Sequence, residues 1–114
     1  MPQFDVFRNP RGGAYPLLLD MQADVLAGLA TRVVVPLTTL KRYGSKPITR
    51  LNPTAAIDGT EYVLVFQELA AIPAASLGEL VTSLASRRTD LIAAVDLTFT
   101  LRGPTLTVAQ PSNE

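Results

Sequence analysis

Short runs in which apolar and polar positions alternate fill the first two-thirds of the chain and predict β-strands. Residues 4–8 alternate with the period of a strand, and a dense turn signal at residues 9–13 follows them. Residues 15–21 resume as an extended segment. Residues 32–37 are largely apolar and β-branched, which is typical of a strand buried on both faces. Because Pro36 cannot donate a ladder hydrogen bond, we expect it to mark the end of this strand or a bulge.

Further extended segments follow in the middle of the chain. Residues 48–57 are interrupted by Pro53, which predicts an edge strand or two short strands. Asp58 and Gly59 separate this segment from residues 61–66, and an Asp-Gly pair is a strong signal for a two-residue hairpin turn. Five or six short strands with tight turns predict a small SH3-like barrel or a strongly curled sheet.

In the last third of the chain the apolar spacing takes the period of a helix, which predicts a closing helix over residues 76–102. Ser76 and Glu79 have the spacing of a capping box. A polar break at residues 86–90, with Thr89 capping a second helix, remains open. The apolar positions that follow the helical spacing are Leu77, Leu80, Val81 and Leu84, and then Leu91, Ile92, Val95 and Phe99.

Gly103 and Pro104 form a stop signal, because Gly can take the left-handed position after a helix and Pro cannot continue it. We therefore expect a single domain over residues 1–103 and a flexible tail over residues 104–114. The predicted fold class is mainly β with a C-terminal α-helix. The stripe formed by the later apolar positions is expected to be core, but an exposed Phe99 next to the stop signal would indicate a partner site.

Composition narrows the chemistry that is available. The chain has no Cys and no His, which removes thiol nucleophiles, disulfides, nearly all zinc sites and the commonest acid–base group. Lys and Arg balance Asp and Glu at ten each, whereas proteins that depend on phosphate contacts normally carry a basic excess. We therefore expect no metal, no cofactor, no direct nucleic-acid contact and no enzymatic activity. The N-terminal residues resemble neither a signal peptide nor a membrane span, so we expect a cytoplasmic protein that does not bind membranes.

Three constellations could carry chemistry, and each has a simpler structural interpretation. Asp20 and Asp24 could form an acid–base pair, but acids at turns are usually solvated or cap backbone N–H groups. The Arg-Gly-Gly run at residues 11–13 lacks the Lys-Ser/Thr of a P-loop and predicts a hairpin tip. Residues 87–90, Arg-Arg-Thr-Asp, could form a ribonuclease-like site, although arginines beside a helix break more often form a solvated surface.

Several segments, taken in their order and spacing, resemble the CcdB family of bacterial toxins over roughly the first hundred residues. These segments are QFDV (3–6), YPLLLDMQADVL (15–26), TRVVVPL (31–37), LNP (51–53), LAAIP (69–73) and TDLIAAVDLTF (89–99). The resemblance implies a barrel-like sheet, a long C-terminal helix and a homodimer. It also implies a toxin that binds the A subunit of DNA gyrase, traps the enzyme on cleaved DNA and is removed by a CcdA-like antitoxin. The same fold occurs in MazF-type ribonucleases.

The resemblance also assigns contact residues for gyrase. The family motif Asp-Val-Gln-Ser-Asp-Ile-Ile matches residues 20–26, which places Gln22, Val25 and Leu26 at the contact. On the helix, Asp96 stands where the family usually has Asn, and Phe99 matches the family Phe.

This chain departs from the family at the end of that helix. Where the family ends on Trp-Gly-Ile, the chain has Thr100, Leu101 and Arg102 and then continues for twelve residues. A buried Trp is among the commonest binding hot spots, so its replacement weakens the expectation of gyrase poisoning. The expected apolar anchors are Val25, Leu26, Phe99 and Leu101, and the expected polar specifiers are Gln22, Asp96 and Arg102.

Three hypotheses follow for function. The leading one is a dimeric CcdB-like toxin that binds gyrase and is neutralised by a CcdA-like antitoxin. The second is a MazF-like endoribonuclease that uses Arg87, Arg88 and Thr89. The third is a CcdB-fold protein that lacks the poisoning contact and persists as an antitoxin-binding module.

Overall fold

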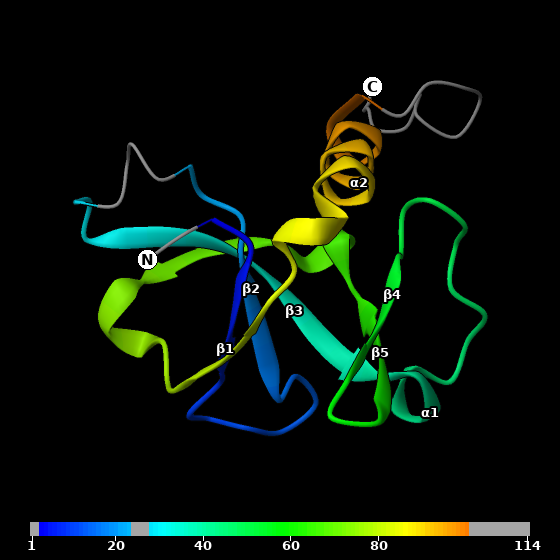
Figure 1. Cartoon of the computed structure of the whole chain (residues 1–114), viewed down its shortest axis with the longest axis horizontal. Coiled ribbons are helices and arrows are strands. Elements are labelled where there is room, and N and C mark those ends of the chain that lie inside the picture. The colour runs from blue at the N-terminus through cyan, green and yellow to red at the C-terminus, as the bar shows by residue number, and fades with distance from the viewer. Residues whose placement is uncertain (1–2, 24–27, 101–114) are drawn as a thin grey trace, which may run out of the picture.

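The computed structural model describes residues 3–23 and 28–100. They form a curled antiparallel sheet, a half-barrel, and a helix at its C-terminal end (Figure 1). The strands are β1 (Asp5–Arg8), β2 (Leu17–Asp20), β3 (Thr31–Thr39), β4 (Thr54–Ile57), β5 (Thr60–Leu64), β6 (Ala70–Pro73) and β7 (Leu80–Ser83). The helices are α1 (Leu40–Tyr43) and α2 (Arg88–Thr100), with 3-10 turns at Phe66–Glu68, Ala74–Ser76 and Ala85–Arg87. The predicted fold class is thereby confirmed.

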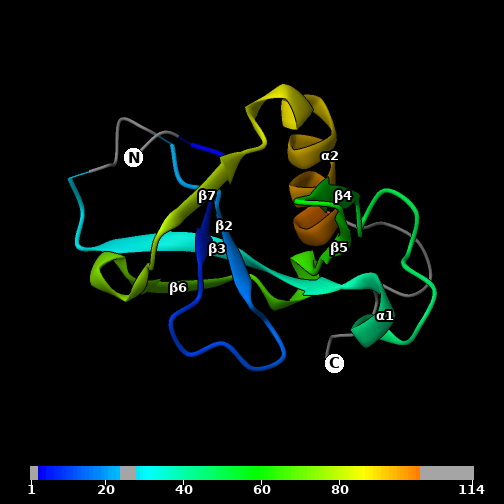
Figure 2. The same cartoon turned by 60° about the horizontal axis from the view of Figure 1, so that its bottom comes forward.

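Strand β3 organises the sheet because it pairs with three other strands. Along one edge it pairs with β2. Along the other edge it pairs first with β6, through residues 31–34, and then with β5, through residues 37–39. The strand order is β4-β5-β3-β2-β1-β7, with β6 beside the first half of β3. Because β3 changes partner along its length, the sheet curls, as both views show (Figures 1 and 2).

Pro36 lies inside β3, opposite Leu18 of β2, so the expectation that it marks a strand end or a bulge is wrong. Its carbonyl accepts a hydrogen bond from the backbone N–H of Val65 at 2.9 Å. Since the nitrogen and carbonyl of one strand residue point to the same edge, the Pro36 nitrogen faces the edge where β3 changes partner. No ladder donor is required at that point, which explains how a central strand tolerates proline.

Both predicted turns are confirmed. Residues 9–13 lie in the connection between β1 and β2, and Gly12 and Gly13 there take positive φ values of 59° and 71°. Asp58 and Gly59 join β4 to β5 with φ values of 51° and 79°, as a two-residue type I′ turn requires. Strand β4 ends the sheet, as expected of an edge strand.

The predicted helix over residues 76–102 is wrong in its first half, because residues 80–83 form β7 and pair with β1. The N–H of Gly78 donates to the carbonyl of Arg8 at 2.9 Å, and a Cβ on Gly78 would lie 2.7 Å from that oxygen. The side chain of Glu79 pairs with Arg8 and forms no capping box with Ser76. Pairing with the distant strand β1 therefore overrides the local helical spacing.

The polar break at residues 86–90 is where the C-terminal helix begins, since α2 starts at Arg88, one residue before the expected cap Thr89. The stop signal at Gly103 and the predicted tail at residues 104–114 lie outside the described residues. In the part of the chain that the structure describes, no helix is long and apolar enough to cross a membrane.

The core lies between the sheet and one face of α2. Its least exposed members are Val6, Leu19, Val35, Leu37, Leu64, Phe66, Leu91 and Ala94. Burial of a large apolar side chain stabilises the fold by about 1.5–3 kcal/mol. The stripe predicted to be core on the helix is only partly so: Leu91 is buried, Ile92 and Val95 are half-buried, and Phe99 is 67% exposed.

Candidate functional site

An apolar groove of about 510 Å³ lies between α2 and the sheet. The sheet contributes Val33 and Val35 from β3, and the segment after β2 contributes Met21 and Gln22. The helix side of the groove is lined by Ile92, Val95 and Phe99. Exposed apolar surface of this kind marks interaction sites, among them sites for another protein.

Phe99 is the most exposed large apolar side chain of the described residues, at 67%. It stands in the last turn of α2, one turn beyond Val95, so the core that buries Leu91 does not reach it. Covering a Phe side chain removes apolar area from water and stabilises a complex by about 1.5–3 kcal/mol. Phe99 is therefore exposed, which is the observation that was expected to indicate a partner site.

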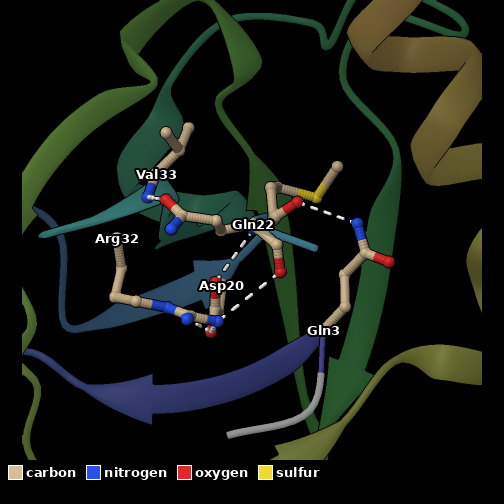
Figure 3. A network of polar contacts seen from close by, with 6 residues as sticks. Gln3, Asp20, Gln22, Arg32 and Val33 are labelled. Atoms are coloured by element: carbon tan, nitrogen blue, oxygen red, sulfur yellow. Dashed lines mark hydrogen bonds and ion pairs between the residues drawn. The ribbon is translucent and has the colours of Figure 1, made fainter. Parts of the chain in front are cut away.

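The wall of the groove is held by a buried ion pair between Asp20 and Arg32, both fully excluded from solvent (Figure 3). The Asp20 carboxylate accepts from Arg32 Nε at 3.1 Å and from Arg32 Nη2 at 2.5 Å. Its other oxygen accepts from the backbone N–H of Gln22 at 2.9 Å. Asp20 is thus a structural counter-ion that caps the chain after β2. The structural interpretation, in which an acid at a turn is solvated or caps backbone N–H groups, is confirmed for Asp20. Asp24, the other member of the expected pair, lies outside the described residues.

Gln22 is buried and its side chain ties two elements together. Its Oε1 accepts from the backbone N–H of Val33 at 3.0 Å, and its carbonyl lies 3.5 Å from Arg32 Nη2. The Gln3 amide donates to the carbonyl of Met21 at 2.9 Å from the other side (Figure 3). The segment that leaves β2 is therefore fixed against β3, and its side chains form a firm border of the groove.

The structure brings two of the expected contact residues, Gln22 and Phe99, to the same groove. Asp96 is exposed one turn before the helix end, and Thr100 is the last residue of α2. The remaining expected contacts lie outside the described residues; these are Val25, Leu26, Leu101 and Arg102.

Arg32, on which the groove depends, was not among the residues predicted from the sequence. A signal for it was present, because Arg32 begins a run whose pattern is typical of a strand buried on both faces. A buried guanidinium requires a counter-ion, and the neighbouring strand offers Asp20.

A second, polar pocket of about 380 Å³ lies at the start of α2. It brings together Arg87, Thr89 and Asp90 of the proposed ribonuclease-like cluster and adds Arg50 from the loop before β4. Arg87 is held by Asp90 at 3.2 Å and by the carbonyl of Thr54 at 3.0 Å. This arrangement provides guanidinium groups for an anion, but Asp90 is already engaged by Arg87 and is not placed as a separate base.

Arg88 does not join that cluster, because its guanidinium lies over the ring of Phe4, 5.7 Å from the ring centre. The turn at residues 11–13 is a hairpin tip, as predicted, and the carbonyl of Gly13 accepts from Arg42 Nη1 at 2.6 Å. Within residues 3–23 and 28–100, no three His, Cys, Asp or Glu side chains gather in a way that could hold a metal ion.

Solved structures with a similar fold include a toxin and two proteins described as endoribonucleases. One is described as an endoribonuclease in complex with its cognate antitoxin from a mycobacterial species; it is 18% identical with a TM-score of 0.69, and the match covers 91% of this chain and 99% of that one. The Mycobacterium tuberculosis toxin MazF-mt6 is 18% identical with a TM-score of 0.69, over 89% of this chain and 100% of that one. An endoribonuclease from a mycobacterial species is 16% identical with a TM-score of 0.67, over 91% and 95%. At these identities the likeness shows the fold alone.

The family profile described as CcdB protein matches residues 3–100, nearly the whole of the described chain. The match includes the segment after β2, strand β3 and all of α2, which line the groove. This chain is a member of the CcdB family.

Proposed function

We propose that this protein is the toxin of a type II toxin–antitoxin system and acts in the cytoplasm by binding another protein. The observation that carries the proposal is the apolar groove with the exposed Phe99 at the end of α2. A side chain of this size, placed at the rim of a rigid groove, has the properties of a binding anchor. The wall of the groove uses its polar groups to hold the backbone, which suits a binding surface better than a reaction site.

The first partner that we expect to bind at the groove is a second copy of this chain. Two copies meeting through α2 would cover Ile92 and Val95 on both chains, as a two-fold interface requires, and would leave Phe99 at the rim for another partner. We expect Val95→Asp to convert the dimer to a monomer, because it would bury an unpaired carboxylate at the interface. Leu80→Asp is the matched control, since Leu80 is exposed on β7, away from the groove. Sedimentation velocity at several protein concentrations would measure the oligomeric state of the wild type and of both variants. A monomeric wild type, or a dimer that persists in Val95→Asp, would contradict the proposed homodimer.

The second partner is the A subunit of DNA gyrase, with Gln22, Val25, Leu26, Asp96, Phe99, Thr100, Leu101 and Arg102 as the contact set. Purified gyrase in a supercoiling and cleavage assay tests this directly. Inhibition by the wild type, weakened at least about tenfold in Phe99→Ala, is the expected result. Leu80→Ala removes an exposed apolar side chain elsewhere and should inhibit like the wild type. Absence of both inhibition and gyrase binding would remove gyrase as the target and leave the family membership unchanged.

A CcdA-like antitoxin is the third partner in this proposal. It is supported by family membership, and one solved structure of the same fold is described as bound to its cognate antitoxin. Growth of cells that express the chain alone, and with the antitoxin encoded beside it, separates two interpretations. Growth arrest relieved by the antitoxin supports the toxin, whereas harmless expression with retained antitoxin binding supports an antitoxin-binding module.

The endoribonuclease hypothesis remains a second candidate because Arg87, Thr89 and Asp90 share one pocket and two solved structures of similar fold are described as endoribonucleases. Incubation of the purified protein with RNA would test it. Cleavage that disappears in Arg87→Ala and persists in Arg8→Ala, whose pair with Glu79 lies on the surface, would favour the enzyme. Intact RNA would favour the binding mechanism.

A further inference from the structure

We propose that residues 105–109 of this chain fold back over the open rim of the groove and cover Phe99 until a partner displaces them. We call these residues, Thr-Leu-Thr-Val-Ala, the tail segment. The inference concerns regulation of the groove by the chain itself. It rests on the proposed function in one respect, because covering Phe99 has a consequence only where another protein binds there.

The first observation is the chemistry of the open rim. Among the described residues that line the groove, Phe99 of α2 and Ala23 after β2 are exposed, and the others are buried or half-buried. None of these lining residues carries a charge. Because a charge is costly to bury in such surroundings, the rim is suited to an uncharged segment with apolar side chains.

The second observation is the pattern of the tail segment. Leu106 and Val108 alternate with Thr105 and Thr107. In an extended chain, alternate side chains point to the same side, so the two apolar side chains would meet the rim together and the two Thr side chains would face water. Residues 103–113 contain no Asp, Glu, Lys or Arg. The tail segment therefore matches the rim in both charge and apolar spacing.

The connection from α2 permits this return. Pro104 cannot continue a helix, and Gly103 can take the left-handed conformation in which a chain turns away from a helix end. Leu106 follows Phe99 by seven residues, and seven extended residues span at most about 25 Å. The helix rises only about 10 Å between Ile92 and Phe99. The tail segment is therefore long enough to reach back along the groove.

Tethering to α2 compensates for the small area that so short a segment covers. A short linker holds its two ends together at an effective concentration on the order of 1 mM, so a weak contact is enough to keep the rim covered for much of the time. A docked fraction between about one half and nine-tenths would weaken the apparent affinity of a partner at Phe99 about two- to tenfold.

The tail segment does not compete with the proposed homodimer, since the dimer would cover Ile92 and Val95 and leave Phe99 at the rim. The CcdB profile ends at residue 100, so the tail segment also lies outside the region that is matched to the family. Its expected competitor is the partner that uses Phe99 as an anchor.

The test measures how well the rim is shielded in the full-length protein. The chain has no Trp, so Phe99→Trp introduces a single fluorophore at the rim. We expect its indole to be shielded from acrylamide. Adding Leu106→Asp and Val108→Asp should raise the quenching constant several-fold and shift the emission to the red, because two carboxylates would have to be buried against the apolar rim. Full quenching before those two changes would overturn the proposal.

The matched control adds Thr105→Asp and Thr107→Asp to the same Phe99→Trp background. It introduces the same charge on the other side of the tail segment and should leave the indole shielded. Equal release in both variants would overturn the proposal. Shielding should also be independent of protein concentration, and its loss on dilution would assign the cover to a second copy and overturn the proposal. No partner is present in this measurement, so its outcome is separate from whether gyrase is the target.

Discussion

The ion pair between Asp20 and Arg32 is where a single substitution tests how the groove is built. Both side chains are fully excluded from solvent, and the carboxylate accepts three hydrogen bonds. Asp20→Asn keeps the size and shape of the side chain and removes its charge. A guanidinium keeps its proton inside proteins, so the variant buries the Arg32 cation without the Asp20 counter-charge.

The magnitude follows from that geometry. The Asn amide has one acceptor oxygen, so it can serve either the N–H of Gln22 or the guanidinium, and its NH₂ group would face a second donor. Removal of one partner of a buried ion pair destabilises a protein by about 3–5 kcal/mol. A domain of this size has a total stability of about 5–15 kcal/mol, so the expected loss is a large share of it.

A double variant tests the same reasoning from the other side. Asp20→Leu combined with Arg32→Met replaces the pair by apolar side chains and leaves no buried charge, so it should cost less than Asp20→Asn alone. We expect about 1–3 kcal/mol for the double variant, because the N–H of Gln22 still loses its acceptor. Glu79→Gln breaks an exposed ion pair with Arg8 and should cost at most about 1 kcal/mol.

Urea unfolding followed by far-UV circular dichroism measures all of these changes. Each variant must be compared at one protein concentration, because a dimer gains stability by mass action. A loss below about 1 kcal/mol in Asp20→Asn would refute the proposed role of the buried pair. So would losses in the single variants Asp20→Leu and Arg32→Met that simply add in the double variant.

Three further predictions concern the fold. Gly78→Ala should cost about 1–3 kcal/mol, because its Cβ would lie 2.7 Å from the carbonyl of Arg8, whereas Gly28→Ala meets nothing within 4 Å and should change thermal stability little. Leu91→Ala should cost about 2–5 kcal/mol in urea unfolding, because the side chain is buried in the core. Gly59→Ala should lower the melting temperature by an amount equivalent to about 1–2 kcal/mol, because Gly59 has a φ of 79° in the hairpin turn; an unchanged melting curve would show that the turn adapts.

Residue types in the sequence were sufficient to predict the turns and the fold class, because these features depend on neighbouring residues. The Asp58-Gly59 turn, the hairpin at residues 9–13 and the mainly β class all follow from residue types that have few alternatives. Strand β7 was not predictable in this way, since adjacent apolar residues at 80 and 81 fit either a helix or a strand. Pairing with β1, more than seventy positions away in the chain, makes this segment a strand. The residues around positions 80–83 do not indicate that pairing.

The candidate site was predictable in part for a related reason. Phe99 was recognisable because it stands beside a stop signal, and Gln22 because of a family motif. Arg32 was overlooked because its function is to hold the backbone that carries Gln22, and such a role appears only when β2 and β3 lie side by side. Residues that position a surface leave weaker signals than residues that form it.

Helix α2 shows why one apolar stripe was not enough to separate core from site. Its thirteen residues present three faces at helical spacing: Leu91 and Ala94 face the core, Ile92, Val95 and Phe99 face the groove, and Thr89, Asp90 and Ala93 face the polar pocket. The core and groove faces are adjacent, so in sequence they merge into a single broad apolar stripe. Ile92 and Val95 also pack against the core cluster, so Phe99, which is 67% exposed, is the groove residue whose substitution should alter partner binding while the monomer stays folded; substitution of Leu91 should destabilise the monomer. That separation allows the partners of this protein to be tested one surface at a time.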